Sequence, residues 1–307
     1  MPLYFAPLEG ITDSIYRRLH HRYFSGVDRY YMPFFSPTMH RCLTKKENRE
    51  LPFATSEDFL AVPQIMTKNP EDFLWAAKQC AERGYQEVNL NAGCPSGTVV
   101  SKGKGSGLLT DPDALDRFLE QIFSNAPLPI SIKTRLGLKN SEEFPRLLDI
   151  FSQYPVQELT IHPRVRTDFY KPPVQLDQFT YALENTQLPL CYNGDIENFS
   201  DLKKMQEQFP QVQSFMIGRG LVGDPGMLCP GGTKVAVLEQ FHNHLLEEYS
   251  VCFGSTRNAM FRMKENWHYL STHFEGGEKL FKSLRKTTDI LEYQQITTEI
   301  FRNLPHI

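Results

Sequence analysis

Cys94 is the side chain with the clearest capacity for chemistry in this sequence. It lies between Gly93 and Pro95, in the segment NLNAGCPS, which follows a short apolar run. A thiol fixed there could act as a nucleophile, a metal ligand or a proton donor. The other cysteines are scattered and form no C-x-x-C pair, a pattern that argues against a zinc site and a disulfide framework. We therefore expect no bound metal and a reducing, cytoplasmic setting.

Two further reactive side chains, Lys133 and His162, come at the ends of short apolar runs. A buried lysine is costly unless an anionic group meets it. Lys133 therefore indicates a partner such as a reduced flavin, a sugar phosphate or an enolate. His162 could donate to a carbonyl or act as an acid, although a single histidine is more often structural.

Two glycine-containing segments are suited to a phosphate. They read Asn193-Gly194-Asp195 and Gly218-Arg219-Gly220, and each follows an apolar run. Backbone N–H groups and one cation are the combination that a phosphate monoester requires. The alternative is that both are tight turns that need glycine for their backbone conformation.

The segment Ser96–Gly107, SGTVVSKGKGSG, is rich in glycine and carries Lys102 and Lys104. We expect a mobile lid that becomes ordered over an anionic substrate. An ordinary flexible loop would have the same composition.

All of these segments follow predicted strands. The strands are expected at Leu3–Ala6, Arg29–Met32, Leu60–Ile65, Glu87–Asn91, Ile130–Thr134, Gln157–Ile161, Pro189–Tyr192 and Ser214–Ile217. Their starts lie roughly 25 to 43 residues apart, which is the spacing of strand–helix–strand units and not of hairpins. Eight such strands predict a closed parallel (β/α)8 barrel, the TIM barrel, in which reactive side chains lie at the carboxyl ends of the strands.

The pattern changes after the eighth predicted strand. From Thr233 onward the apolar residues repeat with helical spacing, and the Gly- and Pro-rich segment Gly223–Gly232 is the expected join. We therefore predict an α/β barrel domain at residues 1–232 and a small all-α helical domain at residues 233–307.

Composition and charge limit the class of protein. The chain has 307 residues, of which 40% are hydrophobic and 22% charged, as in globular proteins and unlike collagen, coiled coils or disordered chains. No apolar stretch is long enough to span a membrane, no secretory leader is recognisable, and nothing requires more than a monomer. Although the net charge of the chain is −3, residues 257–286 have an excess of positive charge, with seven basic and three acidic residues. That excess could meet a phosphate backbone, or it could be a solvated helix face.

Taken in order, these segments resemble the tRNA-dihydrouridine synthases. The segments that carry the resemblance are APLEGITD at 6–13, NLNAGCPS at 89–96, KTR at 133–135, NGDI at 193–196 and IGRG at 217–220. The likeness extends over nearly the whole chain. The Asn-x-Gly-Cys-Pro segment, followed by a loop rich in lysine and glycine, is specific to that family among flavin barrels.

The resemblance implies a flavoenzyme that reduces the C5–C6 double bond of uridines in tRNA. FMN, reduced by NADPH, would pass hydride from N5 to C6, and Cys94 would protonate C5 from the other face. A thiol with an ordinary pKa of ~8.5 carries the necessary proton at neutral pH. The cofactor-binding residues implied are Pro7, Leu8, Glu9, Gln64, Lys133, His162, Asn193, Gly194, Asp195, Gly218 and Arg219. The residues expected at the substrate are Asn91, Lys102, Lys104, Arg164, Arg166, Arg257, Arg262, Lys264, Lys282, Arg285 and Lys286.

The segment His162-Pro163-Arg164-Val165-Arg166 departs from the family pattern, which usually has glycine after the histidine and threonine after the arginine. Proline has no N–H, so any contact of that amide with a phosphate or flavin is lost. Leu8 stands where methionine is commoner, which is a volume-conserving exchange.

Two other functions are compatible with parts of the sequence. One is an FMN barrel that reduces a free pyrimidine or another small enone, and the other is a non-catalytic RNA-binding module that keeps the barrel as a scaffold. A small-molecule enzyme does not need a cationic helical domain. A non-catalytic RNA-binding module does not need Cys94, Lys133 and two segments suited to a phosphate. For a tRNA substrate, extrusion of the target base costs on the order of a few kcal/mol, which contacts between these cations and phosphates could offset.

Overall fold

The chain forms a parallel β-barrel and a set of C-terminal helices. The computed structural model describes all residues, 1–307. Its strands are β1 (Leu3–Phe5), β2 (Arg29–Tyr31), β3 (Ala61–Val62), β4 (Gln64–Ile65), β5 (Val88–Ala92), β6 (Ile130–Arg135), β7 (Leu159–His162), β8 (Leu190–Asn193) and β9 (Ser214–Ile217). Neighbouring strands pair in parallel from β1 to β3 and from β4 to β9. The predicted TIM-barrel architecture with helices at its C-terminal side is thus confirmed.

The third predicted strand is divided in two. The strand order is β3-β2-β1-β9-β8-β7-β6-β5-β4, so β3 and β4 are the two ends of the sheet, and Pro63 alone separates them in the sequence. Proline has no N–H for a ladder, although the Pro63 carbonyl accepts from the Asn89 N–H at 2.8 Å. β3 therefore pairs with β2 and β4 with β5, and the barrel is nearly closed at this point.

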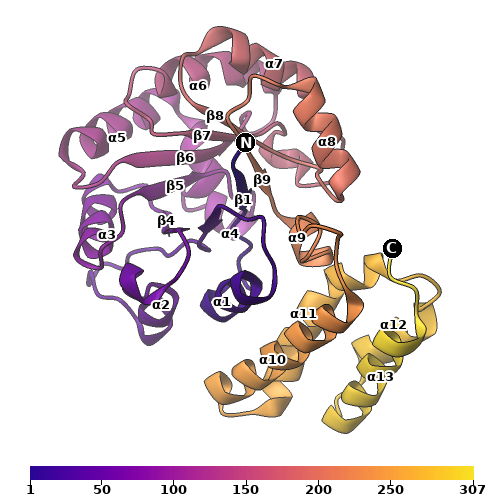
Figure 1. Ribbon diagram of the computed structural model, residues 1–307. Coiled ribbons are helices and arrows are strands. Elements are labelled where there is room, and N and C mark those ends of the chain that lie inside the picture. The colour runs from indigo at the N-terminus through magenta and orange to yellow at the C-terminus, as the bar shows by residue number, and fades with distance from the viewer. The chain divides into compact units, whose positions relative to one another are not determined.

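Helices follow the strands along the chain up to residue 223. They are α1 (Ser14–Tyr23), α2 (Lys45–Glu50), α3 (Pro70–Glu82), α4 (Gly97–Val100), α5 (Pro112–Asn125), α6 (Phe144–Phe151), α7 (Leu176–Asn185), α8 (Phe199–Gln208) and α9 (Arg219–Gly223). Figure 1 shows α3, α5, α6 and α7 outside β4–β8. The Asn69 side chain caps α3 and the Asp111 side chain caps α5, each before a proline. An N-cap followed by proline at the first helical position explains why both helices begin there.

Buried polar side chains occur among the apolar ones of the strands. In β7, for example, Leu159 and Ile161 are fully buried and apolar, and Thr160 alternates with them. Below them, Glu158 accepts from Ser214 Oγ at 2.6 Å, across β8. Burial raises the pKa of this carboxyl. In β7 the polar and apolar side chains thus lie on opposite faces, as the period-2 alternation of a strand places them.

The chain groups into two compact units. The first comprises residues 1–7, 28–195 and 206–216, and the second comprises residues 8–27, 196–205 and 217–307. The second unit contains α1 and α9 as well as the C-terminal helices α10 (Val235–Phe253), α11 (Thr256–Leu270), α12 (Glu278–Lys286) and α13 (Ile290–Asn303). The domain boundary between residues 232 and 233 stays a prediction.

The second unit has its own aromatic core. Phe241 of α10 packs edge-on against Tyr16 of α1, with ring centroids 5.4 Å apart. Trp267 of α11 is almost fully buried, and its indole N–H donates to Tyr293 of α13 at 3.0 Å. Packing of large rings from four separate helices stabilises this unit.

No helix in the chain is both long and apolar enough to cross a bilayer.

Candidate active site

A chain of side-chain amides holds the Cys94 turn at the end of β5. Asn91 Oδ1 accepts from the backbone N–H groups of Gly93 at 3.1 Å and Cys94 at 2.9 Å. Asn91 Nδ2 donates to Gln64 Oε1 at 2.8 Å, and Gln64 Nε2 donates to Asn89 Oδ1 at 2.8 Å. Asn89 in turn donates to Ser131 Oγ at 2.9 Å. The barrel interior thus fixes the position of Cys94.

This network gives Gln64 and Asn91 roles that the sequence did not indicate. Both are buried, Gln64 at 1% and Asn91 at 8% exposure, and both ends of each amide bind protein groups. Each Nδ2 or Nε2 has one further hydrogen to donate. Contacts of Gln64 with a flavin and of Asn91 with uracil stay predictions, and the structure adds a positioning role toward Cys94.

The segment expected to be a mobile lid is folded and packed. It forms α4 and a 3₁₀ helix at Gly105–Thr110, and residues 105–109 are buried. Ser106 Oγ donates to the Cys94 carbonyl at 2.7 Å. Gly105 has φ +57, and a Cβ there would come within 2.9 Å of Cys94 Cβ. The glycines of this segment therefore allow close packing on Cys94, where the sequence suggested mobility.

The two lysines of this segment differ in their surroundings. Lys104 Nζ donates to Ser36 Oγ at 3.1 Å, and Lys102 is exposed. A role for either in substrate binding stays a prediction.

Arg135 connects the Cys94 turn to the segment that follows β7. It is 1% exposed, and its guanidinium donates to three backbone carbonyls: Gly93 at 3.0 Å, Val165 at 3.1 Å and Phe169 at 2.8 Å. Arg135 was not among the predicted site residues. The signal that could have identified it is its position two residues after Lys133, on the same face of β6.

Lys133 is partly buried at the carboxyl end of β6. Burial, with a smaller contribution from the charge of Arg135, lowers the pKa of Lys133 to about 8, and Cys191 and Cys94 act in the opposite direction. Its ammonium makes no hydrogen bond or ion pair with a protein group. A cation with this environment is suited to a bound anion, as the sequence indicated.

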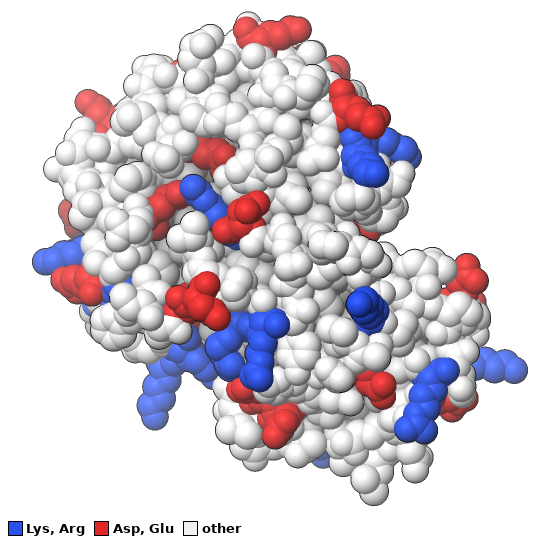
Figure 2. All heavy atoms as spheres, viewed as in Figure 1, with Lys and Arg blue, Asp and Glu red and all other residues white.

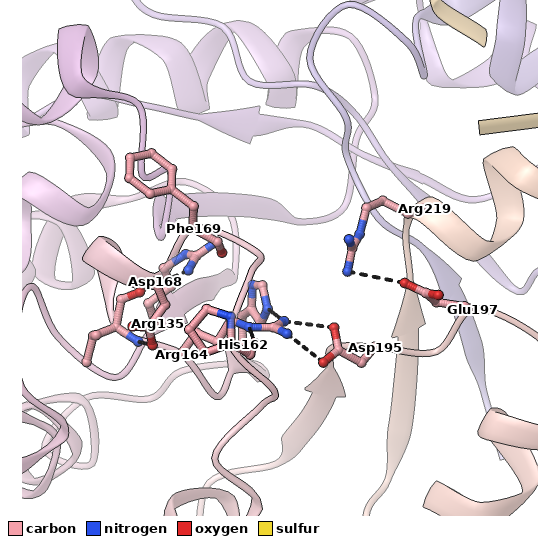
Figure 3. A network of polar contacts seen from close by, with 10 residues as sticks. Arg135, His162, Arg164, Asp168, Phe169, Asp195, Glu197 and Arg219 are labelled. Carbon is pink, nitrogen blue, oxygen red and sulfur yellow. Dashed lines mark hydrogen bonds and ion pairs between the residues drawn. The ribbon is translucent and has the colours of Figure 1, made fainter. Parts of the chain in front are cut away.

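His162, Arg164 and Asp195 form a compact cluster at the ends of β7 and β8 (Figure 3). Arg164 donates to both carboxylate oxygens of Asp195, at 2.8 and 2.6 Å, and lies 2.9 Å from His162 Nε2. Because arginine can only donate, His162 Nε2 accepts and the imidazole carries its proton on Nδ1. The segment after β7 thus sets the tautomer of His162.

The Arg164 side chain is held entirely by protein groups. This side chain is 1% exposed, and its Nε donates to the Pro172 carbonyl at 2.6 Å. All three guanidinium nitrogens are engaged by protein groups. Arg164 thus positions His162 and Asp195, and its role at a substrate stays a prediction.

The segment after β8 is tightly constrained. Asn193 Nδ2 donates to the Met216 carbonyl at 2.8 Å. A Cβ on Gly194 would come within 2.7 Å of Val174, and Asp195 has φ +46. Glycine is thus required at position 194 for space, and the backbone conformation there does not itself require glycine. Phosphate binding by this segment stays a prediction.

Further predicted cofactor residues lie in the second unit. Leu8 and Gly10 form a turn in which the Leu8 carbonyl accepts from the Ile11 and Thr12 N–H groups, each at 3.0 Å. Glu9 in this turn is exposed. After β9, Arg219 pairs with Glu197 at 3.7 Å (Figure 3). The roles of Pro7, Leu8, Glu9, Gly218 and Arg219 at a cofactor stay predictions.

Two of the basic side chains predicted at the substrate, both on α11, donate to backbone carbonyls. Arg262 donates to the Gly10 carbonyl and to Glu265, and Lys264 donates to the Arg285 and Thr287 carbonyls. Both side chains thus connect segments of the second unit, and a role for either at a substrate stays a prediction.

The other helical cations that were predicted to contact substrate are exposed: Arg257, Lys282, Arg285 and Lys286. The last three belong to α12, whose buried face carries Phe281 and Leu284. On the face seen in Figure 2, the basic side chains over the C-terminal helices stand apart, among acidic and uncharged ones. A role for these four in RNA binding stays a prediction.

Substitution of Lys133 by methionine should stabilise the protein when it is stripped of any cofactor. The unfolded chain holds the lysine proton up to about pH 10.5, whereas the folded protein loses it at about pH 8. Below pH 8 both states are protonated, and the buried charge costs on the order of 1–3 kcal/mol of unfolding free energy. Between pH 8 and 10.5 that cost disappears, so wild-type stability should rise relative to the variant.

Urea unfolding of wild type and Lys133→Met at pH 7 and pH 10 measures this difference. The advantage of the variant should be largest at pH 7 and much smaller at pH 10. Lys102→Met, at an exposed position, is the control and should show no such pH dependence. A variant that is less stable than wild type at both pH values would contradict the prediction.

Comparison with known proteins supports the resemblance seen in the sequence. The profile of the family described as "Dihydrouridine synthase (Dus)" matches residues 4–302. The tRNA-dihydrouridine synthase B of Pasteurella multocida is 30% identical over 224 residues, which are 73% of this chain and 66% of that protein. The tRNA-dihydrouridine synthase B of Proteus vulgaris is 26% identical over 314 residues, which are 96% of this chain and 95% of that protein. The chain thus spans about two thirds of the length of the first relative and nearly all of the second.

A solved structure shares the fold. Morphinone reductase superposes with a TM-score of 0.54 at 9% identity, covering 74% of this chain and 84% of that chain. At this identity the likeness concerns the barrel alone.

Proposed function

Because this chain belongs to the dihydrouridine synthase family, we propose that it reduces the C5–C6 double bond of uridines in tRNA, with FMN as cofactor and NADPH as reductant. The observation that carries the proposal is the Cys94 turn. Its thiol lies at the carboxyl end of a parallel barrel, and the Asn91 amide holds its backbone. That end is where barrels of this kind place their chemistry.

The residues at this end of the barrel fit a flavin phosphate. Lys133 presents a partly buried ammonium that no protein group accepts from, which suits an anionic ring. We propose that Lys133 and Gln64 contact the ring, and that residues 193–195 with Gly218 and Arg219 hold the phosphate.

A reduced flavin held by these residues would supply the hydride for C6 of the uracil. Cys94 donates its Sγ proton to C5, so that the C5–C6 double bond becomes a single bond and a thiolate remains. Solvent then returns a proton to that thiolate. The amide chain from Ser131 to Asn91 holds the Cys94 backbone while this transfer occurs, and such positioning is the main contribution that a scaffold makes to proton transfer.

We propose tRNA as the substrate and the cytoplasm as the location. The exposed cations of α12, with Arg257, could contact phosphates of a folded RNA, and such contacts would weaken with salt. The six cysteines are free thiols, in keeping with a reducing compartment. We further propose that the protein acts as a monomer.

The decisive experiment measures two properties of the purified protein, its flavin absorbance and its formation of dihydrouridine in tRNA. Purified protein should be yellow, release FMN on denaturation, and oxidise NADPH while dihydrouridine forms in unmodified tRNA. tRNA that already carries dihydrouridine at every target is the matched control and should give no turnover. Turnover of free uracil or dihydroorotate without competition by tRNA would establish the small-molecule reductase instead. Colourless protein that binds tRNA and cannot be reconstituted with FMN would establish an RNA-binding module.

A further inference from the structure

Phe169, in the segment after β7, has a backbone conformation that large side chains rarely adopt. Its φ is +51 and its ψ is −97. Positive φ brings Cβ too close to the backbone, so a bulky residue there is a true outlier and costs free energy. The Phe169 side chain is 42% exposed, so burial of its ring compensates only in part. A strained aromatic residue with a half-exposed ring is a reason to look for a function.

Two arginines hold Phe169 in this position. Arg135 donates to the Phe169 carbonyl at 2.8 Å, and the same guanidinium donates to the Gly93 carbonyl beside Cys94. Arg166 lies over the Phe169 ring, with its guanidinium carbon 5.3 Å from the ring centroid. The backbone of Phe169 is therefore fixed relative to the Cys94 turn, and its ring carries a cation on one face.

Arg166 makes the second connection to the Cys94 turn. Its Nε donates to the Pro95 carbonyl at 3.1 Å, one residue beyond Cys94. The ring of Phe169 is thus separated from this turn by a single guanidinium group. In Figure 3 the ring extends away from the cluster of His162, Arg164 and Asp195, so its exposed surface is not used by that cluster.

We propose that Phe169 and Arg166 form a binding site for an unpaired nucleobase next to the uridine that is reduced. This inference rests on the proposed action on tRNA. Extrusion of one base deprives its neighbours of a stacking partner. An exposed aromatic ring with an arginine is the combination on which unpaired RNA bases stack. The ring replaces the lost stacking, and the Arg166 charge favours the adjoining phosphate.

The strain at Phe169 makes a sharp test possible, because glycine is free of that strain. Phe169→Gly should leave the melting temperature unchanged or raise it. The same variant should weaken tRNA binding about 5- to 150-fold, the effect of one lost base–aromatic stack. Phe169→Tyr should bind tRNA as wild type does, because its ring can stack equally well. Flavin content and NADPH oxidation without tRNA should be the same in all three proteins.

Phe53→Ala is the matched control. Phe53 is 60% exposed and has the Arg83 guanidinium carbon 5.9 Å from its ring centroid, but it precedes a 3₁₀ helix at Ala54–Ser56 and not the segment after β7. It should bind tRNA with wild-type affinity. Phe169→Trp adds a direct readout, since stacking of a base should quench its fluorescence when tRNA is added.

The outcomes separate the two proposals. If wild type forms dihydrouridine and Phe169→Gly binds tRNA equally well, the nucleobase site is wrong and the proposed function stands. If Phe169→Gly loses stability along with binding, the ring is structural and the inference is overturned. If wild-type protein neither binds nor reduces tRNA, the proposed function itself fails.

Discussion

Cys94→Ala should abolish most of the reduction of tRNA uridines while the protein keeps its fold and its flavin. The alanine retains the Cβ against which Gly105 packs, and the backbone N–H still donates to Asn91. The Sγ atom is lost, and with it the proton that it carries. A positioned general acid contributes about 10²- to 10⁴-fold to a rate, so single-turnover formation of dihydrouridine should slow by a factor in that range.

The spectrum of the bound flavin and the rate of its reduction by NADPH are the internal controls, and both should match wild type. Cys42→Ala removes an exposed thiol and should have no effect on turnover. A Cys94→Ala protein that forms dihydrouridine at the wild-type rate would show that another group donates the proton. Loss of flavin together with turnover would instead assign Cys94 to cofactor binding.

The strands were predictable because each is a short apolar run with a local signal. Ser214–Ile217 forms β9 at the expected residues, and the other strands differ by one to three residues at their ends. The division of the third strand was not predicted, since it depends on which neighbour each side of Pro63 pairs with. Pairing of that kind is decided by closure of the whole barrel and not by local composition.

The site was predictable in its reactive groups and not in the groups that hold them. Cys94 and Lys133 stand out by residue type and by their position after a strand. Arg135, in contrast, acts on the carbonyls of Val165 and Phe169, which lie 30 and 34 residues away. Nothing local predicts such pairs. The same holds for Lys264, which donates to the Arg285 and Thr287 carbonyls, 21 and 23 residues away.

The ion pair between Arg164 and Asp195 should have the largest effect on stability. Arg164→Met leaves the Asp195 carboxylate without its two hydrogen bonds of 2.8 and 2.6 Å. It also removes the donor that fixes His162 Nε2. Breaking a buried pair costs 3–5 kcal/mol as a rule, and the Asp195 side chain is 31% exposed. We therefore expect a loss of about 3 kcal/mol in unfolding free energy, measured by urea denaturation at neutral pH.

Arg146→Met is a close control, because Arg146 pairs with Asp113 at the same distance of 2.6 Å but with side chains 62% and 71% exposed. Exposed pairs contribute about 0–1 kcal/mol, so this variant should lose little. The double variant Arg164→Met/Asp195→Asn should recover part of the loss, because no uncompensated carboxylate remains. Equal, small losses in Arg164→Met and Arg146→Met would mean that the first pair is no more protected from water than the second. The position of His162 would then have to depend on other contacts.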